Sequence, residues 1–230
     1  MKRSRLYKCR GRLYNVCKAS LLQEGIMKEH GDLRKTRSRQ YLVEALIRLM
    51  NAKTIDEISV QNLVEEAQVA RSTFYSQFED KQDFLDTIVE EIFLQLRKET
   101  RPDSYAKEPG LNSVNSCKYY VKHFEYIAKH ADFFRVMLGR NGLPAFRQKM
   151  EESARITYTE ILSSFSDDDL TLPKPYLIQY IISAHIGMTS KWLEDGKKYS
   201  PSYLAELLTH LTYQGVFHGL ELERIVALPK

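Results

Sequence analysis

The spacing of the apolar residues constrains this chain most, because from Thr36 onward it follows the period of an α-helix and never clearly the alternation of a strand. Leu42, Ala45, Leu46 and Leu49 share one face of a helix expected over residues 36–52. Similar stripes recur as far as residue 218 and predict about nine helices. We therefore expect an all-α fold.

Breaks in this pattern divide the chain into segments. Residues 1–33 show no sustained periodicity, whereas residues 34–100 and 112–230 each carry a set of helical stripes. Residues 101–111 contain two prolines and a glycine, which end helices. We expect a linker there, between two helical domains.

The first segment is strongly basic. Residues 1–39 hold twelve Lys or Arg and three acidic residues, whereas the rest of the chain holds 22 basic and 27 acidic residues. This asymmetry is typical of a segment that contacts a polyanion, and equally of a solvated tail.

The start of translation offers another interpretation of this segment. Gln-Glu-Gly at residues 23–25, spelled CAG-GAG-GGN, contains the bacterial ribosome-binding sequence AGGAGG just before Met27, so translation starting at Met27 is an alternative to a basic arm on DNA.

Other classes of protein are disfavoured. No apolar run reaches the roughly 18 residues of a membrane span, and the basic N-terminus lacks a signal-peptide cleavage pattern. Cys9, Cys17 and Cys117 lie far apart, as expected for free thiols in a reducing cytoplasm. The sequence shows no metal-ligand spacing, phosphate loop or nucleophile–base set. We expect no enzyme activity, no metal and no cofactor.

Residues 59–78 have the pattern of a helix-turn-helix, two short helices joined by a tight turn. Ser59 can cap the first helix, and Asp80 can cap the longer helix that follows as far as about Thr100. The core of the motif would consist of apolar residues from both helices and the turn: Val60, Leu63, Val64, Ala67, Val69, Phe74 and Phe78.

The second short helix, expected over about residues 70–77, has an outer face of small and polar side chains. Such a face fits a DNA major groove, because small side chains let the backbone approach the base edges. It also fits an ordinary three-helix core with a polar surface, and spacing alone leaves both open. The candidate DNA-binding residues are Arg71, Ser72, Thr73, Tyr75, Ser76 and, at the start of the next helix, Lys81.

The stretch TIDEISVQNLVEEAQVARSTFYSQFEDKQDFL resembles the DNA-binding domain of TetR-family transcriptional regulators, and the resemblance covers about residues 36–96. It implies phosphate contacts by Thr73, Tyr75 and Lys81. Arg71 and Ser72 would lie closest to the bases, and Thr36 and Arg37 would touch the DNA backbone. The matching positions are Ile58, Ala67, Val69, Thr73, Phe74, Tyr75, Phe78 and Lys81.

Two positions depart from the family pattern. Gln68 stands where the turn usually has glycine, and a left-handed backbone there would cost a non-glycine residue about 1–2 kcal/mol. Ala70 stands where Ser or Thr usually caps the recognition helix, and loss of that cap costs about 1 kcal/mol. We therefore expect a less rigid motif than the family pattern would form.

Residues 112–215 resemble the C-terminal domain of one TetR subgroup common in Firmicutes, which includes regulators similar to the dihydroxyacetone-kinase regulator. The resemblance rests on the aromatic pattern of YYVKHFEYIAKHADFFRVML, LPAFRQKM and YLIQYIISAHIGMTSKWLEDG. It implies a homodimer in which helices 176–194 and 201–218 pair with their copies as a four-helix bundle. The same stripes would equally fill the core of one chain. The implied interface residues are Ile181, Ala184, Gly187, Met188, Leu204, Leu208, Leu211 and Gly215.

The family often encloses a small molecule among its middle helices. The resemblance therefore implies an effector pocket in the C-terminal domain, although aromatic stripes at helical spacing are also what a plain core requires. The candidate lining residues are Phe124, Phe134, Met137, Tyr158, Tyr180, His185 and Trp192.

The sequence thus predicts a three-helix DNA-binding domain followed by a helical ligand-binding and dimerisation domain. The expected protein is a bacterial, cytoplasmic, nucleoid-associated regulator that binds a palindromic operator in double-stranded DNA as a homodimer. Repression under the control of an unidentified small molecule is the leading hypothesis. The alternative is a TetR-like co-regulator that acts through protein contacts and binds DNA weakly or not at all.

Overall fold

The computed structural model describes residues 34–100, 113–163, 166 and 172–219. Within these ranges the chain forms nine α-helices and one short 3-10 helix, without a strand, so the predicted all-α fold is confirmed. No helix within them has the length and apolar character needed to cross a membrane. The predictions for the basic segment, for a start at Met27 and for the linker concern residues outside the described ranges.

The N-terminal domain contains five helical elements. A helix over residues 34–50 precedes the 3-10 helix η1 (Ile55–Glu57), and α2 (Val60–Ala67), α3 (Arg71–Tyr75) and α4 (Lys81–Thr100) follow. The first helix ends two residues earlier than predicted. Its apolar stripe is enclosed, because Leu42, Ala45 and Leu46 are 0% exposed and belong to the same core cluster as the buried residues of α2, α3 and α4.

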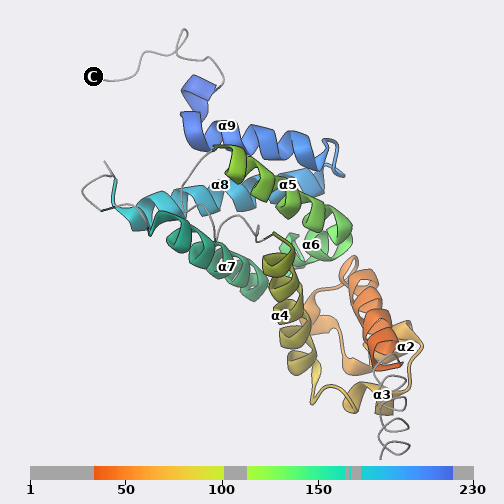
Figure 1. The fold of residues 1–230 in the computed structure, drawn as a ribbon. Helices are drawn as coiled ribbons and strands as arrows, with labels where there is room; N and C mark the ends of the chain where they lie inside the picture. The colour runs from red at the N-terminus through yellow and green to blue at the C-terminus, as the bar shows by residue number, and fades with distance from the viewer. Residues whose placement is uncertain (1–33, 101–112, 164–165, 167–171, 220–230) are drawn as a thin grey trace, which may run out of the picture.

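The C-terminal domain contains α5 (Ser113–Lys129), α6 (Ala131–Leu138), α7 (Pro144–Leu162), α8 (Lys174–Glu194) and α9 (Pro201–Gly219). The most extensive contact joins α5 to α9, and α7 packs against α8. In Figure 1, α9 lies at the opposite end of the molecule from α2 and α3. The backbone of α9 leaves helical geometry at Gly215 (φ 70°, ψ 172°), a conformation open to glycine. The last helix is therefore bent at Gly215 and not continuous to residue 218 as predicted.

The helix α4 belongs to both domains. Its N-terminal half buries Phe84, Leu85 and Ile88 in the core beside α3. Its C-terminal half runs into the second domain, where the rings of Phe93 and Phe146 lie 5.1 Å apart. One helix thus connects the two domains, as Figure 1 shows.

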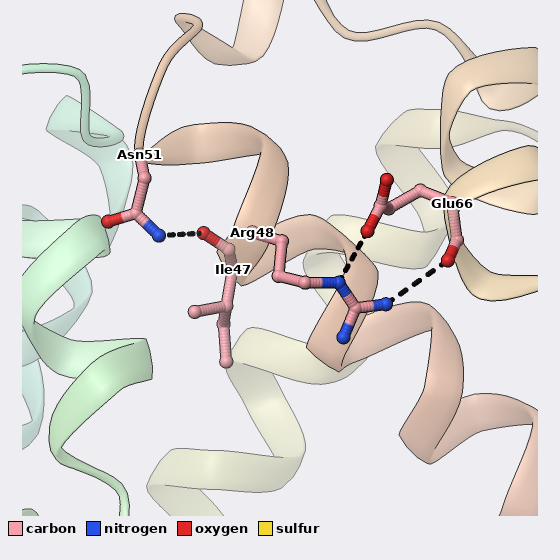
Figure 2. A network of polar contacts seen from close by, with 4 residues as sticks. All are labelled: Ile47, Arg48, Asn51 and Glu66. Carbon is pink, nitrogen blue, oxygen red and sulfur yellow. Dashed lines mark hydrogen bonds and ion pairs between the residues drawn. The ribbon is translucent and has the colours of Figure 1, made fainter.

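A second connection between the domains lies at the end of the first helix. Arg48 donates from Nε to Glu66 Oε1 at 2.5 Å and from Nη2 to the Glu66 carbonyl at 3.1 Å, which ties this helix to α2 (Figure 2). Three residues further on, the Asn51 amide nitrogen donates to the Ile47 carbonyl at 2.9 Å. The Asn51 amide oxygen accepts from Arg135 Nη2 of α6 at 3.2 Å. The first helix is thus bonded to α2 on one side and to the C-terminal domain on the other.

Candidate DNA interface and effector cavity

The helix α2 begins at a capping box. The Ser59 side chain accepts from the Asn62 N–H at 3.1 Å, and the Asn62 side-chain oxygen accepts from the Ser59 N–H at 3.0 Å. The predicted Ser59 cap is confirmed, with Asn62 in the position usually held by Glu or Gln. The predicted Asp80 cap of α4 is also confirmed, because its Oδ1 accepts from the Asp83 N–H at 2.9 Å.

The turn after α2 has the geometry that makes Gln68 unusual. Gln68 lies in the left-handed region (φ 55°, ψ 39°), where its N–H donates to the Glu65 carbonyl at 3.1 Å. The next N–H, of Val69, donates to the Val64 carbonyl at 3.0 Å. These bonds satisfy the end of α2 at the cost of a backbone conformation that glycine adopts more easily. Ala70 starts α3 without a side-chain cap, as its sequence predicts.

Aromatic packing holds α3 in place. Phe74 is 0% exposed and Phe78 is 2% exposed, and both rings contact the buried ring of Phe84 in α4. The ring centroids of Phe74 and Phe84 lie 5.8 Å apart, and those of Phe78 and Phe84 lie 5.0 Å apart. A helix of five residues has little stability of its own. These rings therefore determine where α3 lies.

The opposite face of α3 is open to solvent. Arg71, Ser72 and Ser76 are exposed, Tyr75 is 46% exposed, and Thr73 is half-buried. Arg71 lies along Tyr75, with its guanidinium carbon 5.5 Å from the ring centroid and Nη2 donating to the hydroxyl at 3.3 Å. The structure thus brings a cation and four hydroxyl groups together on one short surface.

Two candidate residues of the first helix, Thr36 and Arg37, are exposed at its N-terminal end. Their neighbour Ser38 is buried and connects this end to α3. Its Oγ accepts from Gln77 Nε2 at 2.9 Å, and the same Gln77 nitrogen lies 3.3 Å from the Thr73 carbonyl. Sequence reasoning missed this link, because two polar residues 39 positions apart give no periodic signal.

Lys81 has a structural function that the resemblance did not imply. Its ammonium donates to the Ile55 carbonyl at 2.9 Å and to the Ile58 carbonyl at 2.8 Å, which joins the start of α4 to η1 and the loop after it. Two of its three N–H groups therefore serve the fold. The implied contact of Lys81 with a DNA phosphate, through its remaining N–H, stays a prediction.

A cavity of about 30 Å³ lies in the C-terminal domain beside the end of α4. It is lined by Phe93, Leu96, Arg97, Thr100, Tyr119, His123, Met150, Ser153, Ala154, Thr157, Tyr158, His185 and Ile186. Tyr158 and His185 were candidate pocket residues and do line it. The side chains of Phe124, Phe134, Met137 and Trp192 are buried in the core and lie outside its wall. Tyr180 is 62% exposed and does not line the cavity, so its assignment to the pocket is corrected.

Two neutral histidines belong to the cavity wall. Burial lowers the pKa of His123 to about 4, and burial, with the nearby His123, lowers that of His185 to about 3. The hydroxyl of Tyr158 lies 2.8 Å from His185 Nδ1 and 3.2 Å from the hydroxyl of Tyr120. His123 was not a candidate residue of the pocket.

The candidate dimer residues fall into two groups. On α8, Ala184 and Gly187 are exposed and Ile181 and Met188 are half-buried, so this face is accessible. On α9, Leu204 and Leu208 are only 4% and 2% exposed within their own chain. These two leucines fill the monomer core because α5 packs along α9, and their assignment to the dimer interface is corrected. Leu211 and Gly215 are half-buried.

Two family models match the chain. The one described as bacterial regulatory proteins, tetR family, matches residues 42–88, and the one described as transcriptional regulator C-terminal region matches residues 115–214. The HTH-type transcriptional regulator YxbF of Bacillus subtilis (strain 168), itself uncharacterized, is 21% identical over 178 residues. That match covers 77% of this chain, and the chain spans 45% of the length of that protein.

Solved structures share the fold at low sequence identity. The TetR transcriptional regulator from Streptococcus agalactiae 2603V is 21% identical with a TM-score of 0.58, covering 80% of this chain and 98% of its own. The fatty acid degradation regulator FadR from Bacillus halodurans is 20% identical with a TM-score of 0.60, and the match covers 79% of this chain and 97% of that protein's chain. FadR from Bacillus subtilis, solved in complex with stearoyl-CoA, is 20% identical with a TM-score of 0.58, and the match covers 77% of this chain and 98% of that protein's chain. At such identities the likeness establishes the fold.

Proposed function

The chain belongs to the TetR family of bacterial transcriptional regulators and carries its DNA-binding domain, and from this premise we propose that it represses transcription by binding a palindromic operator as a homodimer. The observation that carries the proposal is the position of α3. Buried phenylalanines fix one face of α3, and its polar face is left exposed. A regulator of this kind acts on the chromosome, which places it in the cytoplasm, and the proposal involves no catalytic step.

Each exposed group of α3 has a proposed function at the DNA. Arg71 can donate two hydrogen bonds to a guanine edge, and Ser72 can bond a base or a phosphate. The hydroxyls of Thr73, Tyr75 and Ser76 suit phosphate oxygens, which hold the protein in register without reading sequence. Thr36 and Arg37 are exposed at the N-terminal end of the described part of the first helix, where their side chains can contact a phosphate.

The exposed face of α8 supports dimerisation. Ala184 and Gly187 are small and lie one turn apart, so a second copy of α8 can approach closely, and the half-buried Ile181 and Met188 flank them. Two-fold pairing would present two copies of α3 to a palindrome whose half-sites are about 34–36 Å apart.

The cavity supports control by a small molecule. Phe93, Leu96 and Arg97 of α4 line it, and the first turn of the same helix packs against α3 through Phe84. A ligand that prefers one position of α4 would change the separation of the two recognition helices in the dimer. It would thereby shift the population of the DNA-binding state.

A footprint of the promoter of its own gene at two salt concentrations tests DNA binding. We expect a protected palindrome, with affinity falling as salt rises because phosphates are neutralised. Arg71→Ala should relax the preference for the operator over random DNA. Arg147→Ala, an exposed arginine on α7, is the matched control and should leave the footprint unchanged. If no palindrome is protected, the alternative of a co-regulator that acts through protein contacts is favoured. If Arg71→Ala lowers the affinity for all DNA sequences equally, base reading by Arg71 is refuted.

A further inference from the structure

The cavity beside α4 has one apolar and one polar wall. The apolar wall comprises Phe93, Leu96, Met150, Ala154 and Ile186, and the polar wall includes His123, Tyr158 and His185. A cavity of about 30 Å³ has room for about two water molecules. It is the size of a chemical head group, and not of a large ligand.

The polar wall contains one unsatisfied group. His123 Nδ1 is buried, and within the described residues it has no hydrogen-bond partner. Leaving such a buried group unpaired is unfavourable, so a molecule that supplies a partner there is favoured. Tyr158 already bonds His185 and Tyr120, so its hydroxyl is engaged with the protein.

The charges around the cavity argue against an anion. Both histidines that line it are neutral at physiological pH, because burial lowers their pKa values to about 4 and about 3. Among the described residues of the wall, Arg97 alone carries a charge, and its side chain is exposed to solvent. A carboxylate beside His123 would lose its hydration and could gain a countercharge only from this exposed arginine, whose attraction water screens, so its affinity should be several-fold lower.

From this geometry we infer that the cavity is the head-group site for a small uncharged hydroxyl compound, such as a phenol or an alcohol with an apolar body. A hydroxyl can donate to His123 Nδ1 or accept from it, so it satisfies either tautomer of the neutral ring. The apolar wall then contacts the carbons next to the hydroxyl, and the rest of the ligand extends through the open side of the cavity. This inference rests on the proposed control by an effector. It differs from the acyl-CoA thioester bound by the FadR protein of similar fold, which carries several negative charges.

The test compares two probes that share a methylbenzene ring. 4-Methylphenol carries a hydroxyl with a pKa of about 10 and is neutral at pH 7, whereas 4-methylbenzoate is an anion there. Isothermal titration of the full chain should show binding of 4-methylphenol and binding of 4-methylbenzoate that is weaker by about tenfold, the equivalent of one hydrogen bond. Equal or tighter binding of the benzoate, or no binding of either probe, would overturn the inference.

Two matched variants locate the contact. His123→Phe keeps the ring and removes its nitrogens, and it should weaken 4-methylphenol binding by about tenfold. His130→Phe is the control, because its Nε2 is also buried without a partner among the described residues but His130 does not line the cavity. It should bind 4-methylphenol as the unaltered chain does. Unchanged binding by a folded His123→Phe would contradict the inference.

A second measurement covers the case in which His123→Phe fails to fold. In the unaltered chain, 4-methylphenol should shift the imidazole ¹⁵N resonances of His123 and leave those of His130 and His210 in place. Shifts at His130 or His210 without one at His123 would refute the site. Operator binding is measured separately, so that phenol binding can fail while DNA binding stands, and the reverse.

Discussion

Replacing Gln68 with glycine should stabilise this protein, although glycine normally weakens a fold. Gln68 holds a left-handed backbone (φ 55°) between α2 and α3, and its side chain is exposed, so little packing is lost with it. The substitution therefore isolates the effect of the backbone conformation at Gln68, the turn position at which this sequence departs from the family pattern.

Two opposing terms set the magnitude. A left-handed conformation costs a residue with a Cβ about 1–2 kcal/mol, and glycine removes that cost. Glycine also adds freedom to the unfolded chain, which costs about 0.4–1 kcal/mol. The net effect of Gln68→Gly is a gain of about 0.5–1 kcal/mol in the free energy of unfolding.

Urea unfolding of the full chain measures this change. We expect a higher urea midpoint with an unchanged m-value, since the surface exposed on unfolding stays the same. Gln61→Gly is the matched control, the same substitution on the exposed face of α2 seven positions earlier. There the backbone is helical, so glycine should cost about 0.5–1 kcal/mol. Destabilisation of similar size by both substitutions would refute the backbone argument.

Three further predictions follow from the buried contacts. Phe74→Ala should lower the free energy of unfolding by about 3–5 kcal/mol by opening a cavity under α3, and in urea titrations a loss below about 1 kcal/mol would contradict the packing. Lys81→Met should cost about 1–3 kcal/mol, because the carbonyls of Ile55 and Ile58 lose their donor, and an unchanged urea midpoint would show that these bonds contribute nothing. The pKa of His185 is lowered from 6.5 to about 3 in the fold, so only the unfolded chain takes up its proton as the pH falls below 6.5. The neutral His185 therefore contributes its full stabilisation above pH 6.5. About 2 kcal/mol of the free energy of unfolding should be lost by pH 5, and His185→Phe should show a weaker dependence of stability on pH. An identical profile for the variant would refute that assignment.

Local features of the fold could be predicted from the sequence. The Ser59 and Asp80 caps depend on side chains and backbone groups within a few residues of each other. The resemblance to the family implied a turn at Gln68 that favours glycine, and Gln68 does have a left-handed backbone. The period of the apolar residues was enough for the all-α fold and for the burial of Phe74 and Phe78.

The candidate sites were harder to predict, because the period of a helix does not say which neighbour covers it. Leu204 and Leu208 have the spacing of an interface, but α5 packs along α9 and encloses them. Tyr180 belongs to the same helix as His185, yet Tyr180 is exposed and His185 is buried. A resemblance to a family transfers the function of a residue type, and Lys81 instead bonds two carbonyls that lie 23 and 26 positions earlier.

The sequence by itself determined the helices, their caps and the short motif with its exposed polar face, since these depend on interactions over one or two turns. Only the tertiary structure decided which apolar faces are covered, how the first helix bonds both to α2 and to α6, and where two neutral histidines meet beside the end of α4. These features arise from contacts between residues far apart in the chain, and the physical reason is that such contacts leave no period in the sequence.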